Sequence, residues 1–223
     1  MLVIREATTL ADLAAMRAVF ATIWGEGGVP ELNLIRAVHW SGGYASVAEV
    51  DGDVVGGSFG FVGVVPDLHL HSHITGVLPG QQDRSIGFEL KQHQRRWCAT
   101  RDLAVIRWTF DPIVRRNAWF NLRRLGAEVE SFHPDFYGEM HDLLNAGEHT
   151  DRFVVRWDVR TAEPVALVEV PSGAELFALP ADVMALRSTE PDRARAIRME
   201  LRAALDGRRV AGITDAGEYV LVS

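Results

Sequence analysis

Residues 77–90 read VLPGQQDRSIGFEL and form the most informative stretch of the chain. The pattern predicts a long strand over 68–78, a polar loop over 79–85 and a helix directly after it. Such a junction points several unpaired backbone N–H groups at one spot, at the positive end of the helix dipole, and can bind phosphate or pyrophosphate. Arg84 adds a positive charge, and Gly87 allows close backbone approach. An ordinary strand-to-helix connection has the same pattern.

The segments on both sides of this junction predict a mixed α/β sheet. Apolar alternation around the turn at 51–53 favours a hairpin, and the strand–helix–strand order of the middle implies at least one parallel crossover. The expected strands cover 2–7, 45–50, 54–64, 68–78, 104–110, 127 onward and 153–159. The expected helices run from Thr8 or Thr9 to Ile23, and over 32–40, 86–100 and 117–125.

The chain changes in character after Thr161. We expect residues 1–160 to form the main domain and 161–223 a small C-terminal extension. Segments 165–170 and 219–222 fit strands, and 192–205 fits an Arg-rich amphipathic helix with a solvated arginine face. This extension is either a small subdomain or an addition to the main sheet, and its pattern fits both.

The composition is that of an ordinary globular protein. The 223 residues are 48% hydrophobic and 24% charged, with a formal net charge of −7, which argues against a general nucleic-acid binder. The single cysteine, Cys98, cannot form an internal disulfide and predicts a reducing compartment. No apolar run approaches the roughly 20 residues that span a bilayer, and the start lacks a signal-peptide pattern. We therefore expect a cytoplasmic protein with neither membrane nor nucleic acid as partner.

Two stretches resemble the GNAT superfamily of acyl-CoA-dependent N-acyltransferases. The signature of that family is a strand ending in Val-x-Pro, then Arg/Gln-x-x-Gly-x-Gly/Ala at a helix start. Val77 and Pro79 match the first part, Gln82 takes the first position of the second part and Gly87 the last. Residues 105–127 are similar to the family's second strand and its Asn-to-Gly helix. The resemblance implies a GNAT-like α/β fold for residues 1–160.

Three residues depart from the family pattern. Ser85 replaces the first glycine, which costs on the order of 1–2 kcal/mol if the position is left-handed. Asp83 puts a carboxylate beside the expected pyrophosphate, and Leu122 stands where many relatives have the tyrosine that protonates the departing thiolate. Within the superfamily, residues 108–127 look like a group of bacterial acetyltransferases with a C-terminal extension.

The resemblance implies an acetyltransferase with acetyl-CoA as cosubstrate and no metal. The coenzyme would lie between the strands that end near Val77 and Phe110, with its pyrophosphate on the amides of 82–87 and its pantetheine arm along Val77. The residues expected to contact it are Val77, Leu78, Gln82, Asp83, Arg84, Ser85, Ile86, Gly87, Phe88, Asn117 and Phe120.

An amine that attacks a thioester needs an oxyanion donor and a tolerable leaving group. The N–H of Val77 or Leu78 could hold the oxyanion. A thiol with a pKa near about 8.5 gives a thiolate that departs without an acid. Tyr137 is the candidate acid where one is used, although a turn-lining tyrosine has the same sequence context.

The attacking amine also needs a base, and imidazole has a suitable pKa. His69, His71 and His73 alternate along the expected strand and so share one face. His73 is nearest the strand end and is our favoured base, directly or through water, with Glu49 as a second candidate. The non-catalytic alternative for the histidines is that their imidazoles fill a sheet-to-helix layer or its edge. The non-catalytic alternative for Glu49 is a solvated carboxylate on a strand.

Two other classes of function fit parts of the sequence. The His-x-His-x-His pattern is compatible with a zinc site, with His133 or Asp135 as a further ligand. A non-catalytic module that binds acyl-CoA or a protein partner would retain the fold, with its arginine-rich helix facing the partner. The sequence contains no signal that identifies the amine acceptor. A homodimer is compatible with the sequence.

Overall fold

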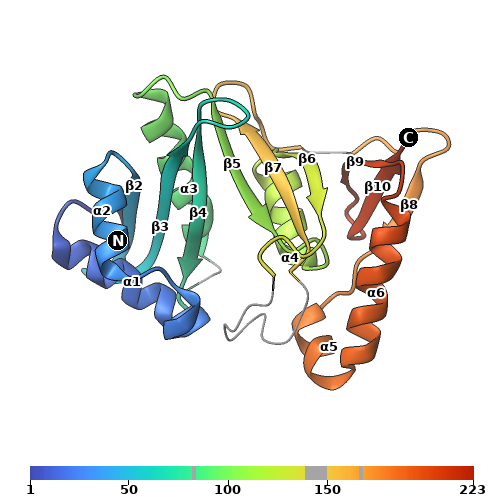
Figure 1. The fold of residues 1–223 in the computed structure, drawn as a ribbon, viewed down its shortest axis with the longest axis horizontal. Helices are drawn as coiled ribbons and strands as arrows, with labels where there is room; N and C mark the ends of the chain where they lie inside the picture. Colours follow the sequence, from blue (N-terminus) through green and yellow to red (C-terminus); the bar gives the residue numbers. More distant parts are fainter. Residues whose placement is uncertain (82–83, 139–149, 166–167) are drawn as a thin grey trace. The chain divides into compact units, whose positions relative to one another are not determined.

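The computed structural model describes residues 1–81, 84–138, 150–165 and 168–223. By their internal contacts the described residues form two compact units. The first contains Met1–Trp108 and Asp158–Arg160, and the second contains 109–138, 150–157 and the described part of 161–223. Each unit is considered by itself (Figure 1).

The first unit contains most of a mixed sheet. Its strands are β1 (Leu2–Glu6), β2 (Tyr44–Val50), β3 (Asp53–Gly63), β4 (His69–Val77) and the start of β5 (Val105–Phe110). β1 to β4 pair antiparallel in sequence order, and β5 pairs parallel to β4. The whole sheet has seven strands in the order β1-β2-β3-β4-β5-β7-β6, which confirms the predicted mixed α/β class.

Helices cover both faces of this part of the sheet. They are α1 (Leu10–Trp24), the 3-10 turn η1 (Glu26–Gly28), α2 (Leu32–Trp40) and α3 (Ile86–Ala99). On one face α1 packs against β3 and β4, since any side chain at Gly76 would meet Ile23 and Trp24. On the other face Ile86 and Leu90 of α3 pack against β2 and β3. The carboxyl end of β4 therefore lies in the same layered unit as the start of α3.

The predicted hairpin is present between β2 and β3. Asp51 and Gly52 have φ values of 53° and 96°, the left-handed pair that a tight two-residue turn needs. The register then pairs Val50 with Asp53. Because side chains alternate along a strand, this turn fixes which residues of β3 face each helix layer.

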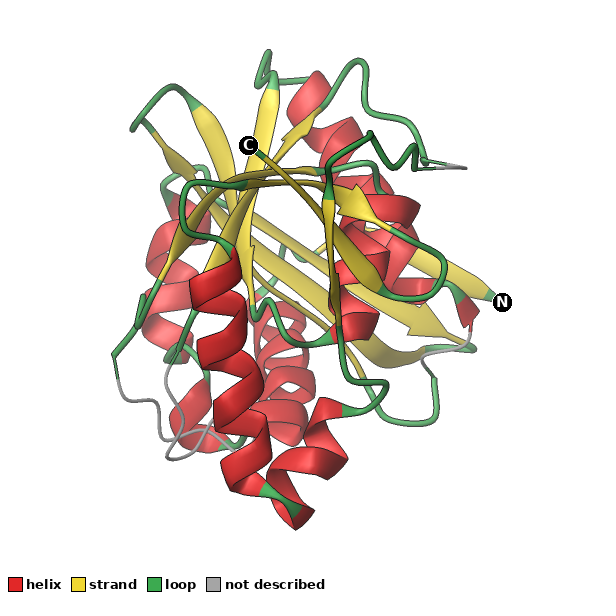
Figure 2. Cartoon of the chain, turned by 90° about the vertical axis from the view of Figure 1, so that its right-hand side faces the viewer, coloured by secondary structure: helices red, strands yellow, loops and turns green. Residues whose placement is uncertain are grey.

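The second unit holds a short helical segment and two groups of strands (Figures 1 and 2). The helical segment is α4 (Arg115–Trp119) with the π turn η3 (Phe120–Arg124). β6 (Glu128–His133) pairs antiparallel with β7 (Arg152–Asp158). A separate sheet has the order β8 (Glu175–Ala178), β10 (Glu218–Val222), β9 (Arg209–Ile213), and α5 (Val183–Thr189) and α6 (Pro191–Ala204) complete the unit.

The tail differs from the prediction in detail. The described residues of 165–170 are not in a strand; the Val165 N–H donates a single backbone hydrogen bond to Arg123. The strands β8 and β9 and the helix α5 had not been predicted. β10, β8 and β9 form their own sheet, so the tail does not extend the main one. Short apolar runs fit strand and coil alike, and only pairing partners separate them.

None of the helices in the described part of the chain combines the length and the apolar composition that crossing a bilayer requires. The division of the chain at residue 160 stays a prediction, because the units defined by contacts divide the chain at a different place.

Candidate functional site

Strands β4 and β5 pair over a short distance only. The register joins Leu70 to Ile106 and His71 to Arg107, and the pairing described ends there. We call the point directly after these pairs, between Ser72 and Trp108, the fork. The rest of β4 continues to Val77 with β3 as its described partner.

A β-bulge lies directly after the fork. The register of β3 and β4 pairs Gly60 with Ser72 but Phe59 with Ile74, so His73 is the extra residue. A bulge bends its strand and increases the local twist. The bulge therefore bends β4 at the point where its described pairing with β5 ends.

The backbone at the end of β4 decides between the two predicted oxyanion donors. The Leu78 N–H donates to the Val55 carbonyl at 2.8 Å, which makes this amide part of the pairing with β3. Successive residues in an antiparallel pair direct their N–H groups to opposite sides. The Val77 amide therefore points away from β3, toward the β5 side. The Leu78 alternative is wrong, and Val77 stays a prediction.

Helix α3 begins without a side-chain cap. Its N-cap residue, Ser85, has φ 57° and ψ 15°, and its hydroxyl makes no capping hydrogen bond. Ser85 therefore adopts the left-handed conformation for which a serine in place of the family's glycine carries an energetic cost. A Cβ added at Gly87 would meet nothing within 4 Å. The first turn thus lies next to open space at Gly87 and receives no side-chain cap from its N-cap residue, whereas Ile86, fully buried, anchors the turn in the core.

The other residues of this loop surround the helix start. Arg84 is exposed and Phe88 is partly buried. Gly80, with φ 81°, turns the chain after β4. The predicted contacts Gln82 and Asp83 lie outside the described residues.

The predicted base lies among aromatic rings. The His73 ring centre is 5.9 Å from that of Phe61, 6.3 Å from Phe59 and 6.1 Å from His71. Desolvation lowers the pKa of His73 below its ordinary value. The same effect, with the positive charges of neighbouring groups, lowers the pKa of His71 to about 4. Both imidazoles are therefore neutral near pH 7, as a proton acceptor must be.

Comparisons with known proteins give a fold but no sequence family. No protein-family model matches the chain, and no curated protein sequence matches it. Solved structures match well. The ribosomal-protein-S18-alanine N-acetyltransferase from Escherichia coli is 15% identical, with a TM-score of 0.56 over 73% of this chain and 97% of the other.

Two further structures were solved with ligands. Naa50 from Arabidopsis thaliana, in complex with a bisubstrate analogue of CoA, is 14% identical, with a TM-score of 0.56 over 70% of this chain and 97% of that one. The yncA protein of Salmonella typhimurium, with its cofactor acetyl-CoA, is 18% identical, with a TM-score of 0.55 over 74% and 98%. The chain has the GNAT acetyltransferase fold.

Glu49 does not fit the role of base in this GNAT fold. Its carboxylate accepts hydrogen bonds from Arg5 Nη2 at 2.6 Å and Nε at 3.1 Å. Glu49 also lies on β2, which β3 separates from β4. The structure does not support this alternative, because the carboxylate is held in an ion pair on another strand.

The remaining predicted residues belong to the second unit. Asn117 on α4 and Phe120 at the start of η3 are both partly buried. The Tyr137 hydroxyl lies 2.9 Å from Thr109 Oγ1. Leu122 is buried, and the helical segment ends at Gly126 with φ 70°, where a Cβ would lie 2.0 Å from the Glu163 carbonyl oxygen. Glycine is required there, as the Asn-to-Gly pattern predicts.

The described residues do not support the zinc alternative. Across residues 1–81, 84–138, 150–165 and 168–223, no group of three or more His, Cys, Asp or Glu side chains is placed to hold a metal ion. His133 Nε2 lies 2.8 Å from Ser131 Oγ, and Asp135 is paired with Arg202.

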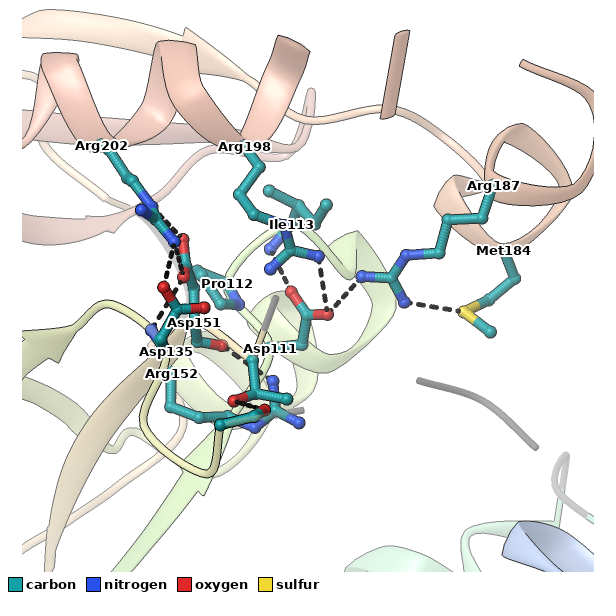
Figure 3. Close-up of polar contacts among 12 residues, drawn as sticks. Asp111, Pro112, Ile113, Asp135, Asp151, Arg152, Met184, Arg187, Arg198 and Arg202 are labelled. Carbon is teal, nitrogen blue, oxygen red and sulfur yellow. Dashed lines mark hydrogen bonds and ion pairs between the residues drawn. The ribbon is translucent and has the colours of Figure 1, made fainter. Parts of the chain in front are cut away.

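Arg193 and Arg195 of α6 are exposed, as predicted, but the other two arginines of the expected solvated face are not (Figure 3). Arg198 is only 2% exposed, and its guanidinium lies 3.8 Å from the Asp111 carboxylate, which also pairs with Arg187. The other Asp111 oxygen accepts the Ile113 N–H at 3.1 Å. Arg202 Nε donates to Asp151 at 2.8 Å. Arg198 and Arg202 therefore hold α6 within its own unit.

Sequence reasoning missed a buried polar cluster at the fork. Lys91 Nζ donates to Ser72 Oγ at 2.8 Å, and Gln94 Nε2 donates to Ser72 and Ser58 at 3.0 and 2.9 Å. Gln94 in turn lies one helical turn after Lys91. Together with Cys98 these residues follow steps of three and four along α3, which is a second buried stripe beside the apolar one. That spacing was the available signal.

Proposed function

We propose that the protein is an N-acyltransferase that transfers an acyl group from coenzyme A, acetyl-CoA in the first instance, to an amine. The observation that carries the proposal is the start of α3, where Ser85 provides no side-chain cap, beside the edge of β4 that pairs with β5 only as far as His71 among the described residues. An uncapped helix start favours an anion such as pyrophosphate. The GNAT fold and the neighbours that were solved with acetyl-CoA or a CoA analogue add support.

In this proposal the coenzyme follows the loop and then β4. Its pyrophosphate accepts hydrogen bonds from the amides at the start of α3, where Gly87 leaves room and Arg84 supplies charge. Its pantetheine arm pairs with the outward backbone of Val77 and leads the thioester back along β4 toward the fork. Contacts from Asn117 and Phe120 stay predictions of the family pattern.

The reaction is a direct attack of the amine on the thioester carbonyl. His73, neutral at pH 7, accepts the proton that the amine loses, directly or through water. The Val77 N–H donates to the oxyanion, and the C–S bond then breaks to release the coenzyme as a thiolate. Tyr137 is the proposed proton donor to that thiolate. The acid limb of the rate profile should then lie below a pH of about 6.5.

We also propose that residues 161–223 are an addition to the acyltransferase domain. The alignments with the three solved neighbours cover 97–98% of the neighbours' chains but only 70–74% of this chain. A region of this chain therefore has no counterpart in them, as an extension would require.

Calorimetry with acetyl-CoA, followed by a thiol-release assay on a panel of amines, tests the proposal. We expect saturable binding and acceptor-dependent release of free coenzyme A, with release reduced in His73→Gln at unchanged acetyl-CoA affinity. Binding without release on any amine would favour the non-catalytic module. Absence of acetyl-CoA binding would contradict both.

A further inference from the structure

The chain contains one lysine, and it is buried at the fork. Lys91 is 4% exposed, and its ammonium lies 3.9 Å from the centre of the Trp108 ring. Its hydrogen-bond partner, Ser72, is the first residue of β4 after the last β4–β5 pair, and Trp108 is the first such residue of β5. The side chain therefore bridges the two strands where they part.

This cation has no anionic partner in the part of the chain that the structure describes. Ser72 accepts one of its three N–H donors, and Trp108 offers the face of a ring. Removing a charge from water without a counter-charge is costly, and burial accordingly lowers the pKa of Lys91 to about 7.

The proposed path of the coenzyme leads the acyl group to this lysine. The pyrophosphate end lies at the start of α3, and the arm runs back along β4 past Val77, so the acyl chain is the part that points toward Ser72. A chain that ends in a methyl group would meet a desolvated charge there. A chain that ends in a carboxylate would supply the missing partner through a charge-assisted hydrogen bond.

We propose that Lys91 is a specificity-determining residue that selects coenzyme A thioesters whose acyl chain ends in a carboxylate. The inference rests on the proposed function and narrows its acyl donor. Acetyl-CoA remains a shorter donor that leaves the ammonium without an anion.

The test compares succinyl-CoA with butyryl-CoA, which has the same chain length but ends in a methyl group. Competition calorimetry on the full chain should show succinyl-CoA binding about ten-fold tighter or more, the range of a hydrogen bond to a charged group. In Lys91→Met the two affinities should become equal, with butyryl-CoA binding at least as well as before. Gln92→Met, the next residue on the same helix, is the matched control and should keep the preference.

A second readout does not depend on affinity. Because Lys91 is the only lysine, protein labelled with ¹³C at the lysine ε carbon gives a single side-chain resonance. Succinyl-CoA should shift this resonance more than butyryl-CoA does. Equal affinities in the unmodified protein, or a preference that survives in Lys91→Met, would overturn the inference alone. If neither thioester nor free coenzyme A binds, the proposed function is wrong as well.

Discussion

Helices α1 and α3 each follow a strand of the first unit, and they begin in opposite ways. Thr9 caps α1: its hydroxyl accepts the Asp12 N–H at 3.1 Å, and Asp12 accepts the Thr9 N–H at 3.0 Å. Arg5 completes this closed arrangement with a hydrogen bond to Asp12 at 2.7 Å. Ser85, at the same position of α3, caps nothing. One helix start is capped by its own side chains, whereas the N-cap residue of the other provides no side-chain cap.

The largest expected effect is a loss of coenzyme A affinity when a negative charge is placed at the start of α3. Gly87→Glu should fold normally, because a side chain there has space and an acidic group suits a helix N-terminus. A carboxylate beside the pyrophosphate should nevertheless weaken coenzyme A binding about hundred-fold or more, since opposing like charges costs several kcal/mol. Calorimetry measures the affinity, and thermal unfolding checks the fold.

The control for that variant is Ala99→Glu, which adds the same charge at the exposed other end of α3. It should leave the affinity for coenzyme A unchanged. If Gly87→Glu binds as tightly as the unmodified protein, the start of α3 is not the pyrophosphate site.

A change at the capped start of α1 should alter the stability of the protein and not its affinity for coenzyme A. Asp12→Ala removes the carboxylate that accepts the Thr9 N–H and pairs with Arg5, and we expect a loss of about 2 kcal/mol in the free energy of unfolding near pH 7. Hydrogen bonds from Arg5 and Thr9 hold the pKa of Asp12 well below its usual range. The stabilisation is therefore present above the unfolded pKa of about 4 and is lost as the pH falls below it.

Urea denaturation across pH 3–7 checks this prediction, where the difference between the two proteins should shrink toward the acid end. Coenzyme A affinity should not change. A difference that stays constant with pH would mean that the Asp12 carboxylate is not the stabilising group.

A smaller effect is expected at the cap residue itself. Thr9→Ala removes one side-chain acceptor and leaves the Arg5–Asp12 pair in place, so the loss should be about 1 kcal/mol. Chemical denaturation is the measurement. An unchanged stability would show that water replaces the Thr9 hydroxyl without cost.

The corresponding change at α3 should have the opposite sign. Ser85→Gly relieves a left-handed conformation at a residue that provides no cap. The gain, offset in part by the greater flexibility of unfolded glycine, should be about 0.5–1 kcal/mol. Denaturation of Thr9→Ala and Ser85→Gly side by side gives the sharpest form of the comparison, and a loss of stability in both would remove the distinction between the two helix starts.

The sequence by itself determined the order of elements through residue 158, the hairpin turn and the open start of α3. These follow from local rules: periodicity, turn chemistry and the needs of helix ends. Gly126 and Ser85 were recognisable as special positions for the same reason. The tail was predicted less well, because its short strands become distinct only when they pair.

Tertiary structure alone decided which predicted groups are free to act. The register between β3 and β4 uses the Leu78 amide and leaves that of Val77. Arg5, far away in the sequence, holds Glu49, and packing of α3 on the sheet brings Lys91 to the fork. Hydrogen-bond direction and the neutralisation of a charge depend on partners distant in the chain, and a pattern read along the sequence does not contain them.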